Sequence, residues 1–150
     1  MSDDENAIHD AFFLDVHTGE ELVEQAENVS EEEVQSTMSF RSLKNIQKRT
    51  LGLFILKLLK GKAHYGYEIK EAIQEEFGVD TSQISAYKAL YKLSEEGLVT
   101  SLVTAKEEGT RSRRYYFITP VGVKLLHEAQ KFVRHYYQAL FGRNESEESF

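Results

Sequence analysis

The sequence predicts an α+β, mostly helical fold in which a basic β-hairpin follows a group of helices. A polar-faced helix is indicated from Ser82 to Glu96, and Gly97 ends it. Two β-prone runs follow, VTSLVT and RYYFIT, and the loop between them carries a glycine and a group of arginines. A helix, a strand, a basic hairpin tip and a second strand, in this order, are typical of a winged helix-turn-helix with a two-stranded wing.

The composition limits the class of protein. The 150 residues are enough for one domain with additional segments. There is no cysteine, which excludes disulfides and thiolate metal sites. The longest apolar run, LGLFILKLL, contains a lysine and is far shorter than the ~20 residues of a membrane span. The acidic N-terminus lacks the features of a signal peptide, so we expect a soluble, cytoplasmic protein with no membrane partner.

The formal net charge of −7 is distributed unevenly along the chain. Residues 1–37 hold 12 Asp and Glu and no Lys or Arg, whereas residues 38–142 hold 17 Lys and Arg against 10 acids. Residues 143–150 hold one Arg and three Glu. A basic module between two acidic ends is compatible with phosphate binding, because the local charge decides that property.

We expect four segments: an acidic N-terminal extension (1–38), a winged helix-turn-helix DNA-binding domain (39–119), a C-terminal dimerisation helix (120–142) and an acidic tail (143–150). The extension is expected to be partly flexible, although Ser30 with Glu33 has the spacing of a capping box and predicts a short helix there. Its apolar residues 12–14 leave three alternatives open. They belong to a solvated tail, dock on the core, or lie in an acidic arm that competes with DNA for the basic face.

Two core helices are expected before the helix that begins at Ser82. Residues 43–60 have apolar side chains at helical spacing around much of the helix, and a glycine follows. Gly66 and Tyr67 open the next helix, which runs to about Phe77 and is closed by Gly78. Tyr67 is expected on its inner face.

The third helix carries the candidate DNA-reading surface, and Thr81 or Ser82 is expected to cap it. Its buried side is an apolar stripe: Ala86, Leu90 and Leu93, supported by Ile84. Its other side gathers polar side chains and cations: Ser82, Gln83, Ser85, Tyr87, Lys88 and Lys92. Such groups bond base edges or phosphates. An ordinary amphipathic helix with a solvated face is the alternative.

The hairpin tip is the second candidate DNA contact. Its cations cluster beside Gly109 and suit the DNA backbone next to a groove: Arg111, Arg113 and Arg114. Alternation along the second strand gives two faces, Tyr116 with Ile118 and Tyr115 with Phe117. A solvated hairpin with scattered charge is the alternative.

A last helix is expected from Pro120 to about Phe141, because proline suits the first helical position. Its apolar side chains follow the spacing of a helix–helix seam: Leu125, Ala129, Phe132, Val133, Tyr136 and Leu140. An apolar face of this size indicates an interface, and a homodimer would cover it. Phe132, Tyr136 and Tyr137 leave two alternatives, ordinary helix packing or a pocket for a small aromatic effector between subunits.

No metal, cofactor or catalytic site is predicted. His64, His127 and His135 lack the acids or cysteines that complete a ligand set at familiar spacing. The sequence shows no Ser-His-Asp set, paired carboxylates or glycine-rich phosphate loop. We therefore expect no enzyme and no cofactor.

Three motifs together resemble the PadR family of transcriptional regulators. They are HYGYEI (64–69), YKALYKLSEEGL (87–98) and RRYYFITPVG (113–122), in the order and spacing of that family. The resemblance covers roughly residues 50–141 and implies a homodimeric winged-helix regulator that binds a palindromic operator, usually as a repressor. On the family pattern Tyr87 and Lys88 face DNA, Tyr116 lies in a wing strand, and the helix from Pro120 dimerises.

The sequence therefore predicts a sequence-specific transcriptional regulator whose partner is double-stranded operator DNA. The alternative is a winged-helix module that binds another protein, with its acidic ends repelling DNA. An electrophoretic shift with DNA from upstream of its own gene, with and without residues 1–38, separates the two.

Overall fold

The computed structural model describes residues 19–104 and 112–142. The chain divides into two compact units, one up to Gln47 and one from Lys48 on. The first unit contains α2 (Gly19–Ala26), α3 (Glu31–Gln35) and most of α4 (Met38–Arg49), and none of the described residues of these helices is buried. Ser30 caps α3, because its hydroxyl accepts a hydrogen bond from the backbone N–H of Glu33 (3.2 Å). The short helix predicted there is confirmed.

The helix predicted over residues 43–60 is interrupted at Thr50. This residue leaves the α-helical region (φ −97°, ψ 13°), and α5 then extends from Leu51 to Gly61. The apolar side chains of α4 at Leu43 and Ile46 are exposed, whereas Leu51 is buried. The prediction of one continuous core helix is therefore wrong, because helical spacing alone does not show where a β-branched residue ends one helix and another begins.

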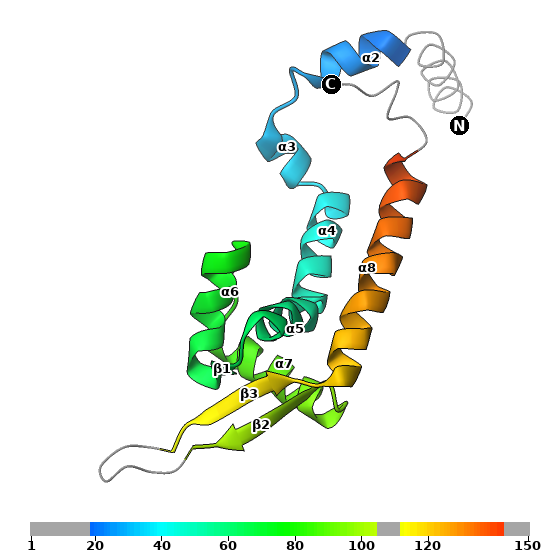
Figure 1. Ribbon diagram of the computed structural model, residues 1–150. Coiled ribbons are helices and arrows are strands. Elements are labelled where there is room, and N and C mark those ends of the chain that lie inside the picture. Colours follow the sequence, from blue (N-terminus) through cyan, green and yellow to red (C-terminus); the bar gives the residue numbers. More distant parts are fainter. Residues whose placement is uncertain (1–18, 105–111, 143–150) are drawn as a thin grey trace, which may run out of the picture. The chain divides into compact units, whose positions relative to one another are not determined.

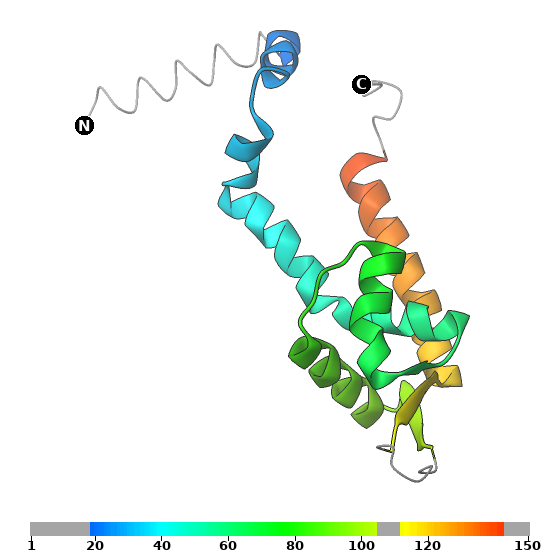
Figure 2. The ribbon, with the colours of Figure 1, turned by 90° about the vertical axis from the view of Figure 1, so that its left-hand side faces the viewer.

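α5 is the centre of the second unit. It contacts four elements of this unit: α6 (Ile69–Phe77), α7 (Gln83–Glu95), β3 (Arg114–Ile118) and α8 (Pro120–Phe141). Figures 1 and 2 show these elements around it. The largest fully buried side chains come from α5, α6 and α7 and belong to one cluster: Ile55, Leu56, Ile69, Ile73 and Leu90. The helices of the predicted helix-turn-helix thus share a single core.

A small antiparallel sheet lies beside these helices, with the strand order β1-β3-β2. The strands β2 (Val99–Val103) and β3 agree with the predicted two-stranded wing. The third strand, β1 (His64–Tyr65), was not predicted, because two residues are too few to show an alternating pattern. The side chains of Tyr116 and Ile118 pack against the core. These elements follow the order of a winged helix-turn-helix that is mostly helical, as predicted.

The second predicted helix begins later than expected. Residues Gly66–Glu68 form a 3-10 turn, η1, and α6 begins only at Ile69. Tyr67 was predicted to face inward, but 48% of its surface is exposed. The reason is the 3-10 turn, because its backbone directs the Tyr67 side chain differently from the α-helix that the prediction assumed.

α8 is tied to the end of α7 by hydrogen bonds around Thr119. The Thr119 hydroxyl accepts from the backbone N–H of Gly122 (3.1 Å) and donates to the carbonyl oxygen of Gly97 (2.7 Å). The backbone N–H of Thr119 donates to the carbonyl oxygen of Leu98 (3.1 Å). Gly122 lies so close to this turn that an added Cβ would collide with the carbonyl oxygen of Leu98. These contacts fix the direction in which α8 leaves the sheet (Figure 1).

We predict that Gly122→Ala destabilises the protein by about 1–3 kcal/mol, because the added methyl group has no room beside Leu98 and Ile118. Gly61→Ala is the matched control, since an added Cβ at Gly61 meets nothing within 4 Å and alanine favours the helix. Thermal unfolding followed by circular dichroism should show a lower midpoint for the first variant only. Equal midpoints for the two variants would contradict the close approach.

Candidate nucleic-acid interface

Ser82 is the N-cap of α7, and its side chain forms hydrogen bonds with the first turn of this helix. The Ser82 hydroxyl accepts from the backbone N–H of Ser85 (3.0 Å) and donates to the Ser85 hydroxyl (2.9 Å). Of the two residues predicted as the cap, Ser82 is therefore the correct one. The cap fixes the first turn of α7, and Gln83, which follows, is partly buried.

One flank of α7 faces the start of α5 and lines a groove of about 460 Å³. Ser85, Lys88 and Lys92, three of the predicted DNA-reading residues, lie along this groove. Lys48 and Arg49 add two further cations to its lining. Apolar side chains of α5, α7 and α8 also line it. The cations make this flank a positive surface, which attracts phosphates.

Ile84 does not support the buried stripe, and this part of the prediction is wrong. It is 69% exposed, whereas Ala86, Leu90 and Leu93 are buried as predicted. Ile84 lies two residues before Ala86, and positions two apart do not share a face of a helix. An exposed isoleucine in the first turn of α7 is a candidate for apolar contact with a thymine methyl group. The two-residue spacing between Ile84 and Ala86 was the signal in the sequence that would have placed Ile84 outside the buried stripe.

The two described wing arginines are exposed and held in different ways. Arg114 donates a hydrogen bond from Nη1 to the hydroxyl of Ser101 on the neighbouring strand (3.0 Å). The guanidinium carbon of Arg113 lies over the rings of Tyr65 (5.7 Å from the centroid) and Tyr67 (5.5 Å). These are cation–π contacts. Arg111, the third predicted wing residue, lies outside the described residues.

The wing and α7 meet at Gly66. An added Cβ at Gly66 would lie 3.0 Å from a ring carbon of Tyr87 and 3.0 Å from a ring carbon of Tyr116. Burial raises the pKa of the Tyr116 hydroxyl above its ordinary value; Arg114 lowers this pKa and Tyr87 raises it further. The structure thus brings together one residue from each of the three sequence motifs.

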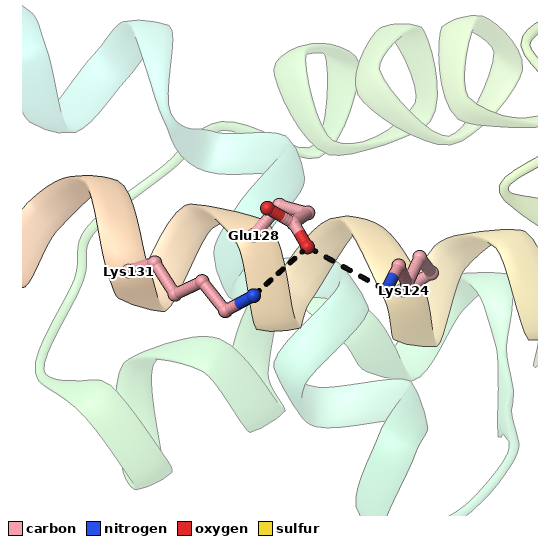
Figure 3. A network of polar contacts seen from close by, with 3 residues as sticks. All are labelled: Lys124, Glu128 and Lys131. Carbon is pink, nitrogen blue, oxygen red and sulfur yellow. Dashed lines mark hydrogen bonds and ion pairs between the residues drawn. The ribbon is translucent and has the colours of Figure 1, made fainter.

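α8 has two contrasting faces. On one face a carboxylate oxygen of Glu128 lies 3.6 Å from Nζ of Lys124 and 3.3 Å from Nζ of Lys131 (Figure 3). The hydrogen bond from Lys131 holds the pKa of the Glu128 carboxyl below its ordinary value. The other face is apolar, and most of the predicted dimerisation residues on it are exposed: Leu125, Phe132, Val133, Tyr136 and Leu140. Ala129 is partly buried.

The residues weighed for an effector or a metal lie apart from the groove beside α7. Phe132, Tyr136 and Tyr137 are exposed, and none of them lines this groove. His64 is buried, with Nδ1 2.9 Å from the carbonyl oxygen of Lys62. In residues 19–104 and 112–142, no group of three or more His, Asp or Glu side chains is arranged to hold a metal ion. Over the same residues, no helix combines the length and the apolar character that a membrane span requires.

Known proteins match this architecture. The transcriptional regulator PadR-like family matches residues 55–128. A transcriptional regulator from Clostridium thermocellum is 25% identical with a TM-score of 0.58, and the match covers 66% of this chain and 94% of that one. Bacillus subtilis PadR, solved in complex with operator DNA, is 30% identical with a TM-score of 0.50, over 55% of this chain and 47% of that one. None of the curated proteins is a significant match.

A PadR family regulator from Eggerthella lenta shares the fold at 21% identity, with a TM-score of 0.61 over 70% of this chain and 90% of that one. The residues matched to the family model begin within α5 and include the sheet, α6, α7 and the first turns of α8. They therefore contain all three sequence motifs. The family consists of regulators, in agreement with the prediction that the protein is not an enzyme. Residues 55–128 of this chain thus match the PadR-like family of transcriptional regulators, and the chain shares the fold of its members.

Proposed function

We propose that this protein binds a palindromic DNA operator as a homodimer and represses transcription there. The observation that carries the proposal is the pair of basic surfaces on either side of α7, with Lys88 and Lys92 on the flank toward the start of α5 and Arg113 and Arg114 on the wing. Cations on both elements suit the phosphates on either side of a groove. The operator complex of Bacillus subtilis PadR supports DNA as the partner.

Under this proposal the first turns of α7 enter the major groove. Gln83 and Ile84 reach base edges there, and Lys88 adds attraction to the phosphates. The wing lies over the neighbouring backbone, where its arginines neutralise phosphates without reading sequence. Affinity then comes mainly from the cations, and sequence preference comes mainly from the start of α7.

The exposed apolar face of α8 supports a dimer. Phe132 is 70% exposed, and Val133, Tyr136 and Leu140 on the same face are exposed as well. Covering this face with the same helix of a second copy buries apolar surface that water otherwise contacts. A two-fold axis through α8 then sets two α7 helices side by side for half-sites about 34 Å apart, which is one turn of DNA. Occupying such a site near a promoter blocks transcription.

We predict that the full chain shifts DNA from upstream of its own gene in an electrophoretic assay. Replacing Arg111, Arg113 and Arg114 together by alanine should weaken binding to every sequence, because these side chains contact phosphates. Each lost phosphate contact should lower the slope of log K against log salt by about 0.9. Replacing Lys124, Lys131 and Arg134 on α8 removes the same charge away from the wing and is the control.

Equal affinity of the wild type and the wing variant at low salt would contradict the wing assignment. The absence of any shift, with the full chain and with a chain lacking residues 1–38, would favour a protein-binding module instead. A footprint of the bound DNA should be symmetric, and the same DNA should drive a reporter gene less strongly when the protein is present. Higher reporter activity would contradict repression.

We predict that Ile84 contacts a thymine methyl group in each half-site. Deoxyuridine in place of that thymine removes only the methyl group. It should weaken wild-type binding about three- to five-fold, which corresponds to the free energy of burying one methyl group. Ile84→Ala should bind the two duplexes equally, and Ile84→Val should keep the preference. Fluorescence anisotropy titrations measure this. The same preference in Ile84→Ala would rule out the contact.

We predict that Phe132→Glu shifts the protein from dimer to monomer, because a charge placed in the apolar α8 face loses its hydration when that face is covered. Gln138→Glu introduces the same charge at an exposed position outside this apolar stripe and is the control. Sedimentation velocity at micromolar concentration should show a monomer for the first variant and a dimer for the second. A dimer in both cases would mean that α8 is not the interface.

A further inference from the structure

A cleft of about 530 Å³ opens between the wing and α7, where η1, α7 and β3 meet. Its lining combines two small residues with aromatic and basic side chains: Gly66, Tyr67, Tyr87, Ser112, Arg113, Arg114 and Tyr116. Gly66, Tyr67 and Tyr116 are not among the site residues predicted from the sequence. The cleft exists only because the three motifs meet.

The charged side chains of this cleft are all cations. Arg113 and Arg114 carry guanidinium groups, which only donate hydrogen bonds, and no carboxylate of the described residues lines the cleft. Glu68, the acid next to Tyr67 in the sequence, is engaged elsewhere. Its carboxylate accepts a hydrogen bond from the backbone N–H of Tyr65 (3.2 Å). The cleft therefore attracts an anion.

The tyrosine hydroxyls of the cleft are available to that anion. Within the described part of the chain, the hydroxyls of Tyr67, Tyr87 and Tyr116 have no hydrogen-bond partner. Tyr91 on α7, in contrast, donates to a carboxylate oxygen of Glu95 (2.9 Å). A tyrosine hydroxyl is ordinarily protonated at neutral pH, and burial raises the pKa of Tyr116 further. The tyrosines of the cleft can thus donate to an oxyanion.

The two guanidinium groups are held in place before any ligand arrives. Arg114 donates from Nη1 to the hydroxyl of Ser101, and the guanidinium group of Arg113 lies over the rings of Tyr65 and Tyr67. These two rings stack on each other with centroids 5.8 Å apart. Both arrangements leave other N–H groups of the arginines for an anion. Side chains that are already ordered lose less entropy on binding.

We propose that this cleft binds one phosphate group of the DNA backbone, with the hydroxyls of Tyr67 and Tyr116 as ligands beside the guanidinium groups of Arg113 and Arg114. The proposal rests on the proposed DNA binding and adds to it a fixed phosphate position between helix and wing. A phosphodiester carries one negative charge and accepts several hydrogen bonds at once, which matches this set of donors. Such a contact sets the register of α7 on the duplex without reading sequence.

The test compares Tyr67→Phe, Tyr116→Phe, the double variant and Arg113→Gln on a duplex that the wild type binds. The phenylalanine variants keep the rings and lose only the hydroxyls. Each hydroxyl should contribute a few-fold, and the double variant should bind about ten-fold more weakly at every salt concentration. Its salt slope should stay unchanged, because a neutral hydroxyl releases no counterion. Arg113→Gln should lower the slope by about one for each subunit.

Duplexes that carry a single neutral methylphosphonate identify the phosphate itself. The wild type should lose affinity at each contacted phosphate, and one of these positions in each half-site should be the phosphate of the cleft. The double variant should lose less at that position than elsewhere, because the contact is already missing. An equal loss at every position, or unchanged affinity of the double variant, would overturn the cleft assignment.

Tyr91→Phe is the matched control, since it removes a hydroxyl on α7 that is paired with Glu95 outside the cleft. It should bind DNA as the wild type does. The unfolding midpoints of all variants should match that of the wild type, so that a lower affinity reports on the contact. A wild type that binds no DNA at all would overturn the proposed function and this proposal together. Normal wild-type binding with unaffected variants would overturn the cleft alone.

Discussion

The packing of Tyr87 and Tyr116 against Gly66 is the contact on which the candidate DNA-binding surface depends. Any side chain at residue 66 would press on both rings, because an added Cβ already lies 3.0 Å from each. The two rings come from α7 and from β3, so their contact with one backbone position sets the spacing between helix and wing. A groove and its flanking phosphates have a fixed separation in DNA, and a surface that recognises both needs such a fixed spacing.

A second constraint acts at the other end of α7. Thr119 joins the turn after α7 to the start of α8, and Gly122 allows the two to approach closely. The apolar face of α8 therefore has a defined direction relative to α7. In the proposed dimer this direction determines how far apart the two α7 helices lie. The hydrogen bonds of one threonine thus link the proposed DNA-reading helix to the proposed dimerisation helix.

Local charge explains how an acidic protein presents a basic surface. The excess of acid lies in the segments outside residues 38–142, whereas α7, the last turn of α4 and the wing supply the cations of the groove and the cleft. Phosphate binding responds to charge within about 8 Å at physiological salt, so the local excess of cations decides the attraction at these surfaces. The arginines of the wing and the lysines of α7 lie on opposite flanks of the same helix, which gives the proposed interface two separate points of attachment.

The sequence by itself determined the third helix and the Ala86, Leu90 and Leu93 stripe, both wing strands, the start of α8 at Pro120 and the resemblance to the PadR-like family. These features are local, since a cap, a period or a motif is complete within one segment. Only the tertiary structure decided the break at Thr50, the short strand β1, the exposure of Tyr67 and Ile84, and the cleft behind Gly66. A two-residue strand has no period of its own, and the cleft joins residues about 50 positions apart. Such features depend on which segments meet in space, and a pattern along one segment does not contain that information.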